Sequence, residues 1–128
     1  MSCSSELERL DLAQQQSGEV LLQCANGEEI QLFVDVEMEF VRYPQMVMDF
    51  EFYKGKELIQ KGGIDPLSGT IDPSDMNKGS AVKDVKFYAK LEGTFQPQKD
   101  TIYAIKPTLI YNDSPDLKIK KFELVFVR

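Results

Sequence analysis

The stretch EIQLFVDVEMEF, residues 29–40, alternates between apolar and mostly polar side chains. Its even-numbered positions are all apolar, whereas its odd-numbered positions include Asp35, Glu37 and Glu39, three carboxylates spaced two residues apart. Successive side chains of a strand point to opposite faces of a sheet, so this period of two predicts a strand with one buried face. The other face is expected to carry Asp35, Glu37 and Glu39.

The same alternation recurs along most of the chain, in short segments separated by turn-forming residues. Seven short strands joined by frequent turns favour an all-β fold, an antiparallel two-layer sandwich. A closed barrel of the lipocalin type is the alternative, although it would need about eight evenly spaced strands. The expected strands are residues 19–25, 28–42, 45–53, 57–61, 82–92, 101–111 and 117–127.

Two local features refine this expectation. Asn26-Gly27 lies between two apolar segments and predicts a tight hairpin turn that joins the first two strands. In the last strand the apolar positions change parity at Lys120-Lys121, which predicts a β-bulge.

The chain is expected to divide into a short N-terminal segment, residues 1–18, and one β-sandwich domain, residues 19–128. The first segment is polar, and its leucines Leu7 and Leu10 stand three residues apart. A thin apolar stripe of this kind is compatible with a short helix or with a tether.

Composition excludes several classes of function. The net charge is −6, from 21 acidic and 15 basic residues, which opposes binding to nucleic acid. The sequence contains no histidine, so serine and cysteine nucleophiles lack their usual base within this chain. Two cysteines are too few for a disulfide framework or a four-thiolate metal site. No enzymatic activity and no cofactor are expected.

Residues 95–105, FQPQKDTIYAI, resemble the tyrosine-corner region of fibronectin type III and immunoglobulin-like domains. The corresponding positions here are Phe95, Pro97, Thr101 and Tyr103, with two additional residues between Pro97 and Thr101. The resemblance implies an immunoglobulin-like sandwich, with Tyr103 at the start of a late strand.

The opening MSCSSELE resembles the mature end of a bacterial lipoprotein. In that family a lipidated cysteine is followed by small and acidic residues and then by a tether. The resemblance implies lipid attachment at Cys3 and a place at the bacterial cell envelope, with the membrane contacted only through the lipid. The rival interpretation is a cytoplasmic interaction module in which Cys3 has no special role.

Asp35, Glu37 and Glu39 would lie about 6.5–7 Å apart along one strand face. That spacing overlaps the carboxylate separation of an inverting glycosidase, so a glycan hydrolase using Glu37 or Glu39 is a rival hypothesis. Three equivalent carboxylates on one alternating strand are more typical of a solvated sheet face.

Residues 62–81 form a long segment that is rich in turn formers and has no periodicity. Its aspartates Asp65, Asp72 and Asp75 are oxygen ligands of the kind that calcium prefers, but their spacing is not that of an EF-hand. Turn formation is the favoured interpretation, and no metal site is expected.

Long loops on a rigid sandwich commonly carry recognition, so this segment is the expected partner-binding loop. We therefore expect a non-enzymatic binding or structural module that recognises a protein or glycan partner through loops or a sheet edge. The residues expected to contact the partner are Asp65, Leu67, Asp72, Met76 and Asn77.

Overall fold

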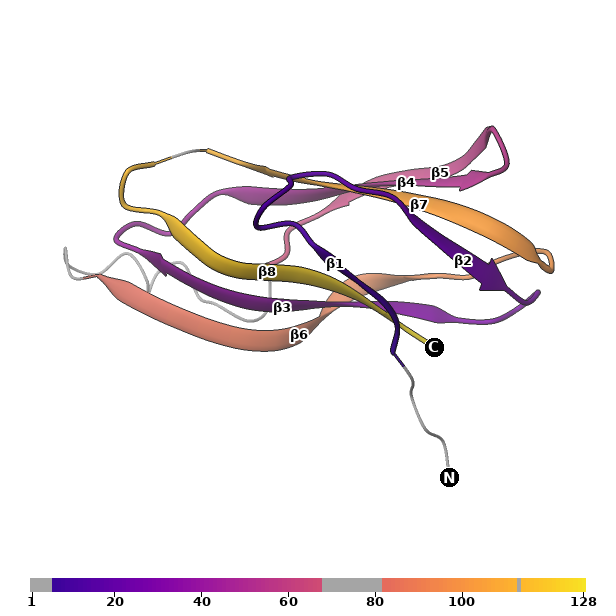
Figure 1. The fold of residues 1–128 in the computed structure, drawn as a ribbon, viewed down its shortest axis with the longest axis horizontal. Helices are drawn as coiled ribbons and strands as arrows, with labels where there is room; N and C mark the ends of the chain where they lie inside the picture. The colour runs from indigo at the N-terminus through magenta and orange to yellow at the C-terminus, as the bar shows by residue number, and fades with distance from the viewer. Residues whose placement is uncertain (1–5, 68–81, 113) are drawn as a thin grey trace, which may run out of the picture.

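The computed structural model describes residues 6–67, 82–112 and 114–128 (Figure 1). This part of the chain folds into eight strands, and it contains no helix that could span a membrane. The strands are β1 (Glu6–Asp11), β2 (Val20–Cys24), β3 (Ile30–Phe40), β4 (Met46–Lys54), β5 (Glu57–Ile64), β6 (Lys83–Phe95), β7 (Thr101–Tyr111) and β8 (Lys118–Val127).

The strands form two antiparallel sheets that lie one above the other (Figure 1). Sheet A has the order β1-β8-β3-β6, and sheet B has the order β2-β7-β4-β5. The expected all-β, two-layer sandwich is therefore confirmed, with one strand more than the seven expected.

The strands do not follow the immunoglobulin-like order that the resemblance of residues 95–105 implied. Immunoglobulin domains pair their first two strands within one sheet. Here, among the described residues, β4 and β5 are the only consecutive strands that pair, and most connections cross between the sheets. This order corresponds to an eight-stranded jelly roll, which is built from two Greek keys.

The core lies between the sheets and follows the alternation seen in the sequence. Along β3 every second residue is buried, from Ile30 to Phe40, and β4 repeats the pattern from Met46 to Phe52. Four aromatic rings join the layers: Phe95 of sheet A lies 4.6 Å from Phe52 and 5.2 Å from Tyr103 of sheet B, measured between ring centroids. Phe50 stacks on Phe52 at 6.0 Å. These contacts fix the two sheets against each other.

The Asn26-Gly27 turn is tight, as expected, but it does not close a hairpin. Glu28 N–H donates to the Ala25 carbonyl at 3.1 Å, and Gly27 has a φ of 80°. However, β2 pairs with β7 in sheet B, whereas β3 belongs to sheet A. Gly27 N–H also donates to the Pro97 carbonyl at 2.9 Å, so the turn is docked against a distant loop and carries the chain from one sheet to the other.

Part of the N-terminal segment is a strand, where a tether or a short helix was expected. Glu6–Asp11 forms β1 and pairs with β8 at the edge of sheet A, with Leu10 opposite Leu124. The apolar stripe is thin because an edge strand of this sheet buries few side chains.

Two other expectations hold in detail. The register of β8 against β3 shifts so that Lys120 has no partner residue, which is the predicted bulge. Tyr103 is buried, and its hydroxyl accepts a hydrogen bond from the Lys99 backbone N–H at 3.2 Å. That bond has the geometry of a tyrosine corner, although the surrounding topology is different.

Candidate functional site

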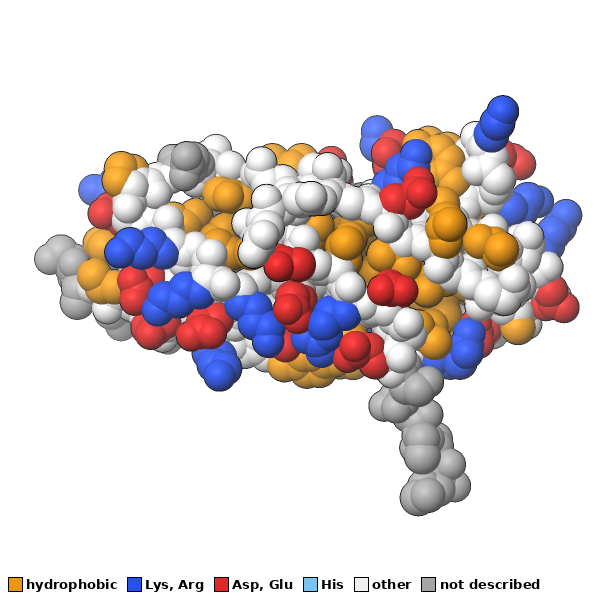
Figure 2. Space-filling view, viewed as in Figure 1, with side chains coloured by type: hydrophobic (Ala, Val, Ile, Leu, Met, Phe, Trp, Pro, Cys, Tyr) orange, Lys and Arg blue, Asp and Glu red, His pale blue; other side chains and the backbone are white. Residues whose placement is uncertain are grey.

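The three carboxylates of β3 lie on the outer face of sheet A, where cations surround them. Arg9 Nη1 donates to Asp35 Oδ2 at 2.9 Å and to Glu123 Oε1 at 2.7 Å. Lys121 Nζ lies 3.0 Å from Asp35 Oδ2, and Lys120 Nζ lies 3.0 Å from Glu39 Oε1. Figure 2 shows the two signs of charge intermingled along β8. This arrangement is that of a solvated sheet face held by ion pairs.

The electrostatics of this face oppose acid catalysis. Burial alone would raise the pKa of Asp35, but hydrogen bonds from Arg9 and Lys121 outweigh it and hold the pKa below its ordinary value. The hydrogen bond from Lys120 likewise lowers the pKa of Glu39. A general acid in a glycosidase needs a raised pKa, and these two carboxyl groups have the opposite shift.

Replacing Asp35 with asparagine is expected to lower the free energy of unfolding at pH 7 by about 1 kcal/mol, the upper end for such pairs. Because the folded-state pKa is depressed, the stabilisation is complete above the ordinary carboxyl pKa and disappears as the pH falls through the folded value. Urea unfolding of both proteins from pH 7 to pH 2.5 should therefore show the two stabilities converging in acid. Glu57→Gln, on the other sheet, controls for the loss of one negative charge, and a difference that persists at pH 2.5 would contradict the prediction.

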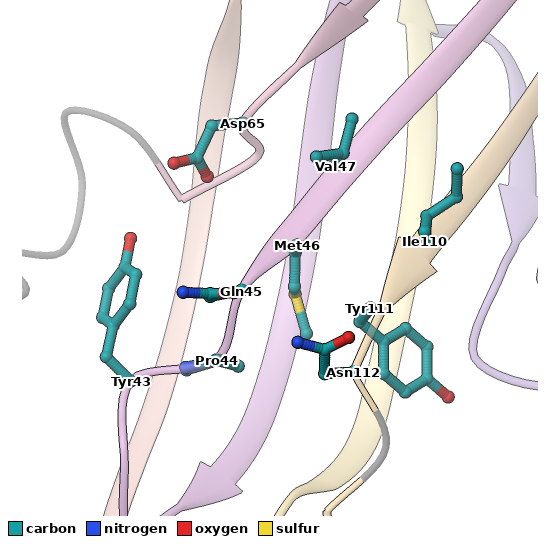
Figure 3. Close-up of a pocket in the computed structure, with 9 residues that line it drawn as sticks. All are labelled: Tyr43, Pro44, Gln45, Met46, Val47, Asp65, Ile110, Tyr111 and Asn112. Atoms are coloured by element: carbon teal, nitrogen blue, oxygen red, sulfur yellow. The ribbon is translucent and has the colours of Figure 1, made fainter.

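A different site lies at one end of the sandwich, where three connections meet (Figure 3). The segment after β3, the segment after β5 and the segment after β7 surround two adjoining hollows of about 300 and 410 Å³. We call the two hollows together the loop-end groove. Its shared wall consists of Tyr43, Pro44, Gln45 and Asn112. The first hollow adds Met46, Val47, Asp65, Ile110 and Tyr111, and the second adds Phe40, Arg42, Ser114, Asp116 and Leu117.

The chain positions Tyr43 firmly within this groove. Its ring packs edge-on against Phe40 with centroids 6.5 Å apart, and Pro44 restricts the backbone that follows it. In Figure 3 the Tyr43 hydroxyl points towards the side of Asp65. Burial raises the pKa of Tyr43, and the negative charge of Asp65 raises it further, so the phenol is a neutral hydrogen-bonding group at pH 7.

The expected partner-binding residues divide between surface and core. Asp65 is exposed and lines the groove, and its Oδ1 accepts a hydrogen bond from the Leu67 backbone N–H at 2.9 Å. Leu67 is 0% exposed and belongs to the core, so its side chain anchors the start of the loop and does not face solvent. The other expected residues, Asp72, Met76 and Asn77, lie outside the described residues.

The candidate ion and lipid sites fall largely outside the described part of the chain. This applies to Cys3, Asp72 and Asp75, which leaves Asp65 as the described member of the three loop aspartates. Among the described residues, no group of three or more histidine, cysteine, aspartate and glutamate side chains could hold a metal ion.

Tyr43 and Asn112 directly follow the strands expected at residues 28–42 and 101–111, and no motif in the sequence predicts a site at either position. Both segments contain an aromatic residue and an amide next to a strand end, Tyr43 with Gln45 and Tyr111 with Asn112. That composition was the available signal of a binding site. It indicates a site only once the jelly-roll order is known, because that order brings the two segments to the same end of the sandwich.

No protein-family model and no curated protein matches the chain. Among solved structures the chain is similar to dimeric latent PorU from Porphyromonas gingivalis, with a TM-score of 0.32 and 10% sequence identity. The match covers 93% of this chain and 10% of that one, so this chain spans about a tenth of the length of PorU. Similarity at this level says nothing about the function of this chain, which depends on the chemistry of its site.

Proposed function

We propose that this domain is a non-enzymatic binding module that holds a glycan chain in the loop-end groove. The observation that carries the proposal is that Tyr43 and Tyr111, the amides of Gln45 and Asn112 and the carboxylate of Asp65 all line one hollow. Aromatic rings offer flat apolar surfaces to the C–H faces of sugars. Amides and carboxylates exchange hydrogen bonds with sugar hydroxyls.

The shape of the groove favours an extended glycan chain over a compact ligand. Its two hollows adjoin along Tyr43, Pro44 and Gln45, and each is near the lower limit of about 300 Å³ for pockets that enclose drug-sized ligands. Its charges are mixed, with Arg42 and Asp116 lining one hollow and Asp65 lining the other, which suits a neutral sugar better than a strongly charged one.

Two observations support binding without catalysis. The sequence has no histidine to act as a base near neutral pH. The carboxylates Asp35 and Glu39 are held in ion pairs with depressed pKa values, on the outer face of sheet A. The competing hydrolase hypothesis predicts new reducing ends in glycans incubated with the protein, and their loss in Glu37→Gln or Glu39→Gln.

The glycan proposal is tested by screening an array of neutral oligosaccharides and measuring the affinity of any bound member by calorimetry. Tyr43→Ala is expected to weaken binding at least tenfold, about 1.4 kcal/mol, because it removes the ring surface shared by both hollows. Tyr88→Ala is the matched control, since Tyr88 is an exposed tyrosine on β6 away from the groove. No binding across the array, or equal loss in both variants, would contradict the proposal.

A lipid anchor at Cys3 and a place at the bacterial cell envelope stay proposals from the sequence, because Cys3 lies outside the described residues. The fold is compatible with them. β1 begins opposite Val127, at the end of β8 that lies away from the loop-end groove (Figure 1). A tether joined to β1 would therefore leave the groove facing away from the membrane.

A further inference from the structure

Exposed apolar side chains gather on the outer face of sheet B. The described residues include eight large hydrophobic side chains that are exposed, and five of these lie on that face. The five are Leu21 of β2, Val47 of β4, Leu58 of β5, and Ile102 and Ile110 of β7. A surface patch of this kind commonly marks a protein–protein interface.

The register of the strands arranges this face in rows that run across the sheet. One row is apolar and consists, in order from β2 to β5, of Leu21, Ala104, Tyr53 and Leu58. We call these four residues the apolar row. They alternate along β2, β7 and β4 with residues that are buried in the core, so they point to the outside of the sandwich.

The next row along the strands is charged. It consists, in the same order, of Glu19, Lys106, Glu51 and Lys61, so the sign of the charge alternates across the sheet. Glu19 stands directly before β2, and its Oε2 lies 3.6 Å from Lys106 Nζ. Lys106 Nζ also lies 4.7 Å from the centroid of the Tyr53 ring, which keeps it close to the sheet surface. We call these four residues the charged row.

We propose that the outer face of sheet B binds a second copy of the chain, about a two-fold axis that runs parallel to the strands between β4 and β7. Such an axis reverses the order of the strands in the facing copy, so that β7 lies opposite β4 and β2 lies opposite β5. Lys106 then meets Glu51 of the second copy, and Glu19 meets its Lys61. A two-fold interface uses the same surface twice and must be complementary to itself, and an alternating row of four charges meets that condition.

The apolar row is complementary to itself about the same axis. Leu21 faces Leu58 of the second copy. Tyr53, the largest side chain of the row, faces Ala104, the smallest. Burial of these side chains would supply the affinity, whereas the charged row would fix the orientation of the two copies.

The remaining rows of the face also match. Val47 pairs with Ile110, and Asp49 pairs with Thr108. The axis therefore sets one apolar residue against another, and it sets the Asp49 carboxylate against a hydroxyl group that can donate to it. Val47 and Ile110 also line the loop-end groove, so the grooves of the two copies would lie at the same end of the dimer.

The outer face of sheet A lacks this self-complementarity. Its two central strands are β8 and β3, and Asp35 of β3 pairs with Glu123 of β8. The equivalent axis would set Asp35 against Glu123 of a second copy, which places like charges opposite each other. Sheet B is therefore the face that suits a second copy.

The size of the face suits a dimer that dissociates on dilution. Four strands about 4.8 Å apart, over the nine residues of β4 with a rise of about 3.4 Å each, present roughly 600 Å² of flat area. The relief of the side chains increases the accessible area towards the standard of about 800 Å² for each partner of a stable complex.

Sedimentation velocity of the whole chain, over a wide range of protein concentration, tests the proposal. We expect a monomer–dimer equilibrium whose dissociation constant rises at least tenfold in Glu51→Lys and in Lys106→Glu, because each change sets like charges opposite each other. Leu21→Ser should weaken the dimer through the apolar row. Glu37→Lys, which makes the same charge change on the outer face of sheet A, should leave the equilibrium unchanged. A monomer at every concentration, or equal weakening by Glu37→Lys, would overturn the proposal.

A mixture of Glu51→Lys and Lys106→Glu distinguishes contact between copies from effects within one chain. In the mixed dimer the lysine introduced at position 51 faces the glutamate introduced at position 106, and the native Lys106 faces the native Glu51. We expect the two variants, verified as folded by circular dichroism, to associate with each other about as strongly as the wild type does with itself, although each alone is largely monomeric. A mixture that stays monomeric would overturn the proposal. Tyr43→Ala should dimerise normally, so failure of the glycan proposal leaves this one intact.

Discussion

Replacing Phe95 with alanine is expected to lower the free energy of unfolding by about 3–5 kcal/mol. Phe95 is 1% exposed and is the ring of sheet A that stacks on Phe52 and meets Tyr103 edge-on in sheet B. Its removal takes a large apolar surface out of the core and leaves a cavity between two sheets that cannot close together freely. Urea unfolding followed by tyrosine fluorescence measures the loss.

The matched control is Tyr88→Ala. Tyr88 stacks on Phe33 on the outer face of sheet A and is 52% exposed, so this change removes an aromatic contact without opening a core cavity. We expect it to cost about 1 kcal/mol, the range of an aromatic pair. If Phe95→Ala cost no more than Tyr88→Ala, the aromatic cluster would not be what holds the sheets together.

Strand positions were largely predictable because burial acts locally on a strand. An alternating segment such as residues 30–40 can satisfy its apolar residues only with one face on a core, whichever strand pairs with it. The expected strand at residues 101–111 matches β7, and the parity change at Lys120 located the bulge of β8. Each of these features depends on residues that are close in sequence.

Strand partners were not predictable from the same signals. Asn26-Gly27 specifies a reversal of the chain, but no neighbouring residue determines whether the next strand belongs to the same sheet. The sheet to which each strand belongs depends on the hydrogen bond from Gly27 N–H to the Pro97 carbonyl and on the pairing of β2 with β7. Both contacts join segments that are distant in sequence. β1 was missed for a related reason. Its residue Arg9 is held by Asp35 and Glu123, whose positions no local pattern reveals.

The candidate site was predictable only in part, again because it is assembled from distant segments. The loop after β5 was expected to bind a partner, and Asp65 does line the groove. Tyr43 and Asn112 come from two other connections, and each reads locally as a turn. The jelly-roll order brings them to the same end of the sandwich, and that order was not contained in any local pattern.

Substitutions at Leu67 and Asp65 distinguish the structural role of the loop after β5 from its role in recognition. Leu67→Ala is expected to lower the free energy of unfolding by about 2–5 kcal/mol, because the side chain is 0% exposed and packs in the core. Asp65→Ala, two residues earlier, removes an exposed carboxylate and the hydrogen bond that it accepts from the Leu67 N–H, which should cost about 1 kcal/mol.

Urea unfolding ranks the stabilities of the two variants, and glycan binding is measured on each variant under conditions where it stays folded. We expect Leu67→Ala to bind normally and Asp65→Ala to bind more weakly. If Leu67→Ala instead kept its stability and lost binding, Leu67 would be a contact residue, as the sequence suggested, and its burial would belong to the unbound state only.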